Sequence, residues 1–245
     1  MNAKRLLAGT AVLLASLGAE SQAVDGAPAP GTSRTLTLPR SAAAYGKMQH
    51  APLALLPGEV VLTFDDGPNP ASTPAVLRAL ADDHVRATFF MNGEPLMHEP
   101  ELARRVRAEG HSVGMHGFEH AHFAQYSPER QLGDLREMEI AFTRVFGDKA
   151  PAYRFPFLEE TEPLTKALAD QGLTVMSADV GIDDWLPDQS PEMLVQRLLD
   201  RLGKAGGGIV LLHDAQPQTA AALPSLLRAL HQHGYRIVHL EWEGR

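Results

Sequence analysis

Carboxylate, imidazole and guanidinium side chains occur in short clusters, each directly after a stretch of apolar residues. The clusters are Asp65–Asp66, His116 with His120, Arg154, Asp179, and His213–Asp214. Carboxylates and imidazoles can bind a metal ion, and the same groups can take up or release a proton. If the apolar stretches are parallel strands, their ends meet on one face of the domain, and the clusters converge on one site.

The spacing of His116 and His120 is compatible with a pair of metal ligands. Residues four apart on a helical turn place their side chains on the same side. Two imidazoles and a carboxylate from elsewhere in the chain form a three-ligand site that leaves positions for water and substrate. Such a pair also occurs by chance, and His122 lies close by, so the interpretation needs a second cluster.

Asp65 and Asp66 supply that second cluster. Two adjacent carboxylates repel one another unless a cation or an arginine offsets their charge. One of them can then bind the cation while the other accepts a proton. The sequence Asp65–Pro68 is also typical of a solvent-exposed turn, and taken alone it favours that simpler interpretation.

Alternating strands and helices must position these clusters. Apolar runs predict buried strands over Val60–Phe64, Ala87–Met91, Ser112–Met115, Leu173–Ser177, Gly208–Leu212 and Tyr235–Leu240. Helices are predicted over Ala75–Asp82, Leu96–Ala108, Glu129–Phe146, Pro163–Gln171, Glu192–Lys204 and Ala220–His233. Thr73, Ser127 and Ser190 each precede a proline and are predicted helix caps. Regular β-α alternation indicates an α/β fold with a parallel sheet, either open or closed into a barrel.

The N-terminal residues are typical of a secretory signal. A short basic stretch, Lys4–Arg5, precedes the apolar run Leu6–Leu17 and the small residues around Ser21–Ala23. The apolar run is too short to span a bilayer comfortably, so no stable membrane span is expected after signal removal. We therefore expect a signal peptide over residues 1–23 and a secreted or periplasmic protein.

Two further segments follow the signal. Residues 24–58 are rich in Ala, Pro, Gly, Ser and Thr, which indicates a flexible leader, with one short strand at Thr35–Leu38. The folded domain is expected over residues 59–245.

Composition excludes several classes of function. The 245 residues contain no cysteine, which rules out disulfides, cysteine-ligated zinc and thiol nucleophiles. The formal net charge of −8 argues against a nucleic-acid partner, since such proteins usually present a basic surface.

Five ordered motifs resemble the polysaccharide deacetylase family, whose members carry the NodB homology domain and form carbohydrate esterase family 4. The motifs are Thr63–Pro68, His116-x-x-x-His120, Arg154–Phe157, Asp179…Asp184-Trp185 and Leu211–Asp214, and the resemblance covers roughly residues 59–240. It implies a distorted, TIM-barrel-like (β/α) barrel. It also implies a metal-dependent hydrolase that removes N-acetyl groups from a glycan containing N-acetylglucosamine.

The resemblance assigns roles to these residues by position. Asp66, His116 and His120 would bind one divalent metal ion, expected to be Zn²⁺. Asp65 would be the general base that activates water, and Arg154 would keep it ionised. His213 would be the general acid, oriented by Asp184. The substrate-binding residues would be Trp185 and Leu211, around the acetyl methyl, and Phe157, whose backbone N–H would contact the oxyanion.

The sequence departs from the family pattern in the loops around the site. Gly117 stands where the family usually has Ser or Thr, which removes a hydroxyl that helps to order the loop. Phe157–Leu158 replaces the usual Tyr-Gly, and Gly181 replaces an Asp unless Asp183 substitutes for it. These changes leave the base, the acid and the metal ligands in place and bear on the choice of substrate.

Two alternatives to N-deacetylation stay open at this stage. An O-acetyl esterase could use the same residues, because an ester leaves more easily than an amide. A non-catalytic glycan-binding module could use the same fold, although the presence of Asp65 and His213 argues against it. Chitin oligomers, peptidoglycan and poly-N-acetylglucosamine all present the same acetamide, so the sequence does not select the glycan, and it does not define the oligomeric state.

Overall fold

The computed structural model describes residues 31–244, so the predicted signal over residues 1–23 lies outside the described part. Its strands form a ten-stranded sheet in which every pair of neighbours is parallel. The strands are β1 (Thr32–Leu38), β2 (Ala44–Tyr45), β3 (Glu59–Asp65), β4 (Thr88–Met91), β5 (Ser112–Met115), β6 (Ala152–Tyr153), β7 (Thr174–Met176), β8 (Val180–Gly181), β9 (Gly208–His213) and β10 (Arg236–Trp242).

The strand order runs β1-β10-β3-β4-β5-β6-β7-β2, and β9 joins β3 to β8. β2 and the residues after it lie beside the segment that connects β7 with β8. The N–H of Ser177 donates to Tyr45 O (2.7 Å), and that of Met48 donates to Ala178 O (2.9 Å). The predicted α/β fold with a parallel sheet is confirmed, in a barrel-like form that is distorted at this junction.

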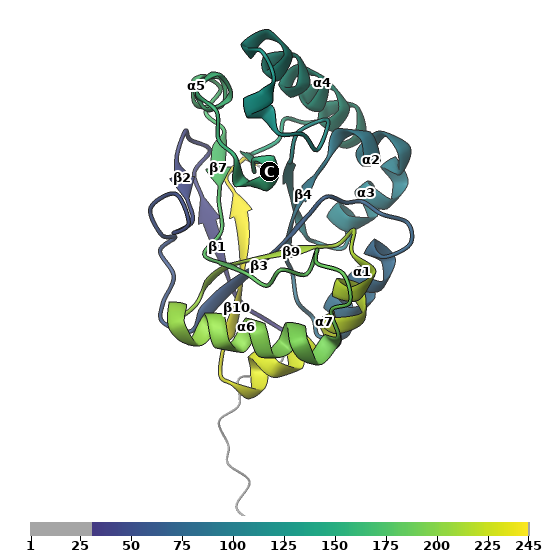
Figure 1. Ribbon diagram of the computed structural model, residues 1–245, viewed down its shortest axis with the longest axis vertical. Helices are drawn as coiled ribbons and strands as arrows, with labels where there is room; N and C mark the ends of the chain where they lie inside the picture. The colour runs from purple at the N-terminus through teal and green to yellow at the C-terminus, as the bar shows by residue number, and fades with distance from the viewer. Residues whose placement is uncertain (1–30, 245) are drawn as a thin grey trace, which may run out of the picture.

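Seven α-helices of the described residues lie around the outside of the sheet (Figure 1). They are α1 (Thr73–Asp82), α2 (Gly93–His98), α3 (Pro100–Ala108), α4 (Pro128–Phe146), α5 (Glu162–Asp170), α6 (Pro191–Ala205) and α7 (Pro217–Gln232). None of the helices within residues 31–244 combines the length and the apolar character that a membrane crossing requires.

Two helix predictions differ from the structure. The predicted helix Leu96–Ala108 is two helices that meet at Glu99, because the residue before a proline is disfavoured in the α conformation and Pro100 follows. Thr73 lies within α1, whose N-cap is Ser72, and the Thr73 hydroxyl contacts Asp214 instead of capping. Ser127 and Ser190 do accept the capping hydrogen bonds, from the N–H groups of Arg130 and Met193.

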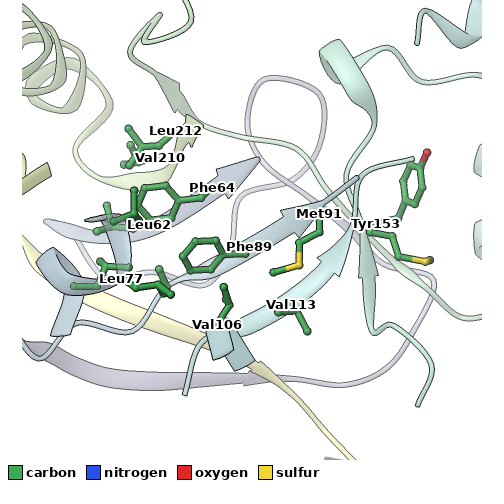
Figure 2. Close-up of a cluster of buried hydrophobic side chains, with 14 of the residues drawn as sticks. Leu62, Phe64, Leu77, Phe89, Met91, Val106, Val113, Tyr153, Val210 and Leu212 are labelled. Carbon is green, nitrogen blue, oxygen red and sulfur yellow. The ribbon is translucent and has the colours of Figure 1, made fainter. Parts of the chain in front are cut away.

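Strand alternation divides the core into an outer and an inner layer. Leu62, Phe64, Phe89 and Val210 belong to the outer cluster, which packs beneath the helices (Figure 2). The residues of the inner cluster alternate with them along the strands and include Val61, Phe90, Ala152, Met176 and Ile209. Successive side chains of a strand point to opposite faces. A residue two positions after a member of the inner cluster therefore also faces the barrel interior.

The segment predicted to be a flexible leader is ordered where the structure describes it. Within residues 31–58, β1 pairs with β10 along Thr32–Leu38, and β2 pairs with β7. Leu38 and Leu53 are buried in the inner cluster. The prediction of a leader up to residue 58 is therefore wrong for this part, because long-range pairing with β7 and β10 orders a segment that has little periodicity of its own.

Candidate active site

Asp65 and Arg154 form a buried ion pair at the carboxyl ends of β3 and β6. Asp65 continues the inner set after Val61, and Arg154 continues it after Ala152, so both side chains face the interior. Arg154 Nη1 donates to Asp65 Oδ1 at 2.8 Å, and the two side chains are 0% and 3% exposed.

All three guanidinium nitrogens of Arg154 donate hydrogen bonds. Its Nη1 also donates to Thr63 Oγ1 (2.7 Å), its Nε to Met176 O (2.9 Å) and its Nη2 to Ser177 O (2.9 Å). The guanidinium carbon lies 4.3 Å from the centre of the Phe90 ring. Burial lowers the pKa of Arg154, while the Asp65 carboxylate opposes that shift. This network fixes the orientation of Asp65, because a buried charge pair is stable only when its remaining hydrogen-bonding groups are satisfied.

Asp66, His116 and His120 converge beside this ion pair. Each of the three offers one ligand atom, and these atoms lie within 4.8 Å of one another. Asp66 Oδ1 is 3.4 Å from Nε2 of His116 and 3.3 Å from Nε2 of His120. Asp65 also lies close, with its Oδ2 3.7 Å from His116 Nε2.

The donor set of these three residues fits a divalent cation. Asp66 Oδ1 is buried and has no hydrogen-bond partner, although an unpaired buried oxygen is costly. His116 Nδ1 lies 2.8 Å from Arg154 O, a contact in which the ring nitrogen donates, so Nε2 is left as a ligand. Burial raises the pKa of Asp66, but the adjacent His116 imidazole, together with His213 and His120, lowers it to about 2. The carboxylate is therefore in its ligating form at neutral pH.

The loop between His116 and His120 is held from outside the five motifs. Asn92 Nδ2 donates to His116 O at 2.6 Å. Asp134, on α4, accepts the N–H groups of Phe118 (2.9 Å) and Glu119 (2.8 Å). Sequence analysis missed both residues, and no motif marks them.

Gly117 adopts a left-handed conformation at the start of this loop. Its φ is +81°, and an added Cβ would lie 2.9 Å from Glu119 O. Glycine suits this turn because it carries no Cβ. The backbone of this loop is held by Asp134, which accepts the N–H groups of the two residues after Gly117.

His213 and Asp184 form a second pair at the carboxyl end of β9. His213 Nδ1 lies 2.8 Å from Asp184 Oδ1, and the His213 N–H donates to Asp184 Oδ2 at 2.8 Å. Thr219 Oγ1 adds a third hydrogen bond to the same carboxylate (2.6 Å). Burial by itself lowers the pKa of His213, but the hydrogen bond and charge of Asp184, with the charges of Asp65 and Asp66, raise it to about 9. His213 therefore carries a proton at neutral pH.

Three predicted substrate-binding residues lie around these groups. The Trp185 ring meets the His213 ring edge to face at 5.6 Å and is 48% exposed. The Phe157 ring is also 48% exposed, lies 4.3 Å from the His120 ring and stacks on His122 at 3.9 Å. Leu211 is buried on β9, two residues before His213 and therefore on the same face of the strand.

The remaining carboxylates of the fourth and fifth motifs have structural partners. Asp183 Oδ1 accepts from Arg201 on α6 at 2.9 Å, so its carboxylate pairs with a helix outside the site and not with His213. Asp179 accepts the N–H groups of Lys47 and Ile209. Asp214 is buried and contacts the Thr73 hydroxyl.

Known proteins with similar sequences and structures are polysaccharide deacetylases. The sequence profile of that family matches residues 55–176. The peptidoglycan-N-acetylglucosamine deacetylase PgdA of Listeria monocytogenes is 31% identical over 80% of this chain, and the match spans 41% of that protein. The chain thus corresponds to about two fifths of the PgdA length.

Two further relatives correspond to larger shares of their own chains. The chitooligosaccharide deacetylase of a Bradyrhizobium species is 33% identical over 73% of this chain and 87% of its own. The structure of a Bdellovibrio bacteriovorus peptidoglycan deacetylase superposes with a TM-score of 0.78 at 31% identity, covering 91% of this chain and 63% of that one. Together with the ordered motifs and the geometry of their residues, these matches show that the chain belongs to the polysaccharide deacetylase family.

Proposed function

We propose that this protein is a metal-dependent hydrolase that removes N-acetyl groups from a glycan containing N-acetylglucosamine. The observation that carries the proposal is the grouping of Asp66, His116 and His120 beside a buried Asp65–Arg154 ion pair. The signal-like residues 1–23 support a place of action outside the cytoplasm, either secreted or periplasmic.

A divalent cation, expected to be Zn²⁺, would be held by Asp66, His116 and His120 and would polarise the acetamide carbonyl and make water more acidic. Asp65 would take a proton from water as the general base. Its Oδ1 is bound to Arg154, which leaves Oδ2 as the oxygen that accepts. The ion pair with Arg154 fixes the direction of the Asp65 carboxylate, which a general base requires.

His213 is the proposed general acid. An amine is a poor leaving group unless it is protonated, so amide hydrolysis needs a proton donor near the nitrogen. Asp184 binds His213 Nδ1, which leaves Nε2 to deliver the proton. The raised pKa of His213, about 9, keeps that proton in place at neutral pH.

The residues around the site would bind the sugar. The exposed rings of Trp185 and Phe157 offer apolar surfaces, and Leu211 would lie near the acetyl methyl. The backbone N–H of Phe157 would donate to the oxyanion as charge develops on the carbonyl oxygen. A donor of this kind contributes on the order of 3 kcal/mol to transition-state stabilisation.

The pairing of His213 with Asp184 favours an amide substrate over an ester. An alkoxide leaves more readily than an amine, so an O-acetyl esterase depends less on a proton donor. His213→Ala should therefore reduce acetate release from N-acetylglucosamine oligomers far more than release from an aryl acetate. Equal losses on both substrates would argue that neither reaction uses His213 as its acid.

The first test is acetate release from N-acetylglucosamine oligomers by residues 24–245. We expect release with added Zn²⁺, loss of release with a chelator, and recovery when Zn²⁺ is restored. Asp65→Asn should abolish release while Zn²⁺ binding, measured by calorimetry, persists. Sugar binding without turnover at full Zn²⁺ occupancy would refute the hydrolase and identify a glycan-binding module.

A further inference from the structure

The loop that follows Arg154 has an unusual backbone conformation. Phe157 and Leu158 have φ values of 55° and 56°, and neither is glycine. A left-handed conformation at a residue with a Cβ costs free energy, so two in succession need support from their surroundings. This loop carries the Phe157 ring, which packs against the His120 and His122 rings.

Support comes from a segment more than a hundred residues earlier in the chain. Gln49, just after β2, donates from Nε2 to Leu158 O at 2.6 Å. The adjacent His50 places its Nε2 2.5 Å from Glu160 Oε1. The Leu158 carbonyl and the Glu160 side chain are thus both tied to the segment that follows β2.

Gln49 is itself held in place. Its Oε1 accepts from Ser177 Oγ at 2.7 Å, so the two contacts of the amide fix which end points to Leu158. Gly46 lies against the Ser177 backbone, where an added Cβ would be 2.6 Å from the carbonyl carbon. The Ser177 carbonyl in turn accepts Arg154 Nη2 at 2.9 Å. One serine therefore connects Gln49 with the arginine that orients Asp65.

From these contacts we infer that Gln49 is a positioning residue for catalysis. Its side chain holds the 156–160 loop in the conformation that presents Phe157 to the site. The matched region of the family profile begins at residue 55, so this support comes from outside it. The inference rests on the proposed deacetylase function for its kinetic consequence, while the conformational consequence can be measured without turnover.

The test compares Gln49→Ala with the matched control Gln196→Ala. Gln196 is an exposed glutamine on α6 whose Nε2 also makes a side-chain hydrogen bond, to Asp200 Oδ1 at 2.8 Å. We expect Gln49→Ala to lower kcat roughly three- to tenfold with little change in KM, since a net hydrogen bond supports the loop. Amide hydrogen exchange of a peptide covering 156–160 should accelerate. Gln196→Ala should change neither readout.

A second pair of variants separates positioning from general damage. Leu158→Gly removes the cost of the left-handed backbone, so in the Gln49→Ala background it should restore part of the lost kcat. Leu158→Ala retains the Cβ and should restore none. Unchanged exchange and kcat in Gln49→Ala would overturn the inference, as would equal effects of the Gly and Ala substitutions. If the wild type releases no acetate at all, the proposed function fails, and the exchange data alone decide whether Gln49 orders the loop.

Discussion

Replacement of Asp184 by Asn tests the proposed proton donor through the pH dependence of the reaction. Asp184 is fully buried and binds both the Nδ1 and the N–H of His213. The pKa of His213 rises from 6.5 to about 9 despite burial, which opposes the charged form. A cation bound at Asp66 would offset the charges of Asp65 and Asp66, so Asp184 is the partner that sustains the raised pKa in the loaded enzyme.

The size of the effect follows from the two pKa values. A general acid must be protonated to act, so activity should fall as the pH rises through the pKa of His213. At pH 8 a histidine with a pKa of about 9 is about nine-tenths protonated, whereas one with the ordinary pKa of 6.5 is about 3% protonated. Asp184→Asn should therefore lower kcat/KM roughly 30-fold at pH 8, and by less than about threefold at pH 6.

The assay is acetate release from an N-acetylglucosamine oligomer, measured across pH 6 to 9.5 with Zn²⁺ bound. Asp183→Asn is the matched control, because its carboxylate pairs with Arg201 instead of His213. The alkaline limb of the profile should move to lower pH in Asp184→Asn and stay in place in Asp183→Asn. A loss of equal size at pH 6 and pH 8 would refute the reasoning, since damage to the fold alone does not follow the titration of His213.

Three further predictions concern stability. Arg154→Met leaves the Asp65 charge buried without its partner and should lower the free energy of unfolding, measured in urea, by about 3–5 kcal/mol. The control is Arg105→Met, which removes an exposed ion pair with Glu109. It should change the free energy of unfolding by less than about 1 kcal/mol. A chain that begins at Glu59 lacks β1 and β2, so it should show no cooperative thermal transition where residues 24–245 do. Burial raises the pKa of Asp214 to about 7, against the hydrogen bond with Thr73 and aided by the charges of Asp66 and Asp65. Folding then favours the protonated acid, and stability falls as pH rises from about 4 to 7. We compare the unfolding free energy of Asp214→Asn with that of wild type, both treated with chelator. The variant's free energy minus that of wild type should increase by roughly 2 kcal/mol from pH 5 to pH 8. The same difference at both pH values would contradict this.

The parallel sheet and the meeting of the motifs were predictable because they depend on local patterns. Each apolar run marks a strand, and the polar cluster after it falls at a carboxyl end. Alternation along β3 sets the direction of Asp65, and alternation along β9 sets that of His213. The pairing of Arg154 with Asp65 follows from the same rule applied to β6.

The N-terminal strands were harder to predict because their order comes from distant partners. β2 is two residues long, too short to show a period, and it is defined by pairing with β7. β1 has a longer alternating pattern, but its register is set against β10, some two hundred residues later. A segment rich in Pro, Gly and Ala gives little local sign of such pairing. Residues 24–58 were therefore predicted to be a flexible leader with one short strand at Thr35–Leu38, which falls within β1.

At two departures from the family motifs, side chains from distant parts of the chain contact the loop concerned. At position 117 the loop lacks a hydroxyl, and Asp134 holds its backbone from α4. At position 158 the loop has a leucine with a left-handed backbone in place of a glycine, and Gln49 donates a hydrogen bond to the carbonyl of that leucine. Neither Asp134 nor Gln49 lies in a motif. Each bonds to backbone atoms of a loop distant in the sequence, so the residues near that loop give no sign of it. The residues that support such a loop must therefore be sought among those that the fold brings to it, and not only among its neighbours in the sequence.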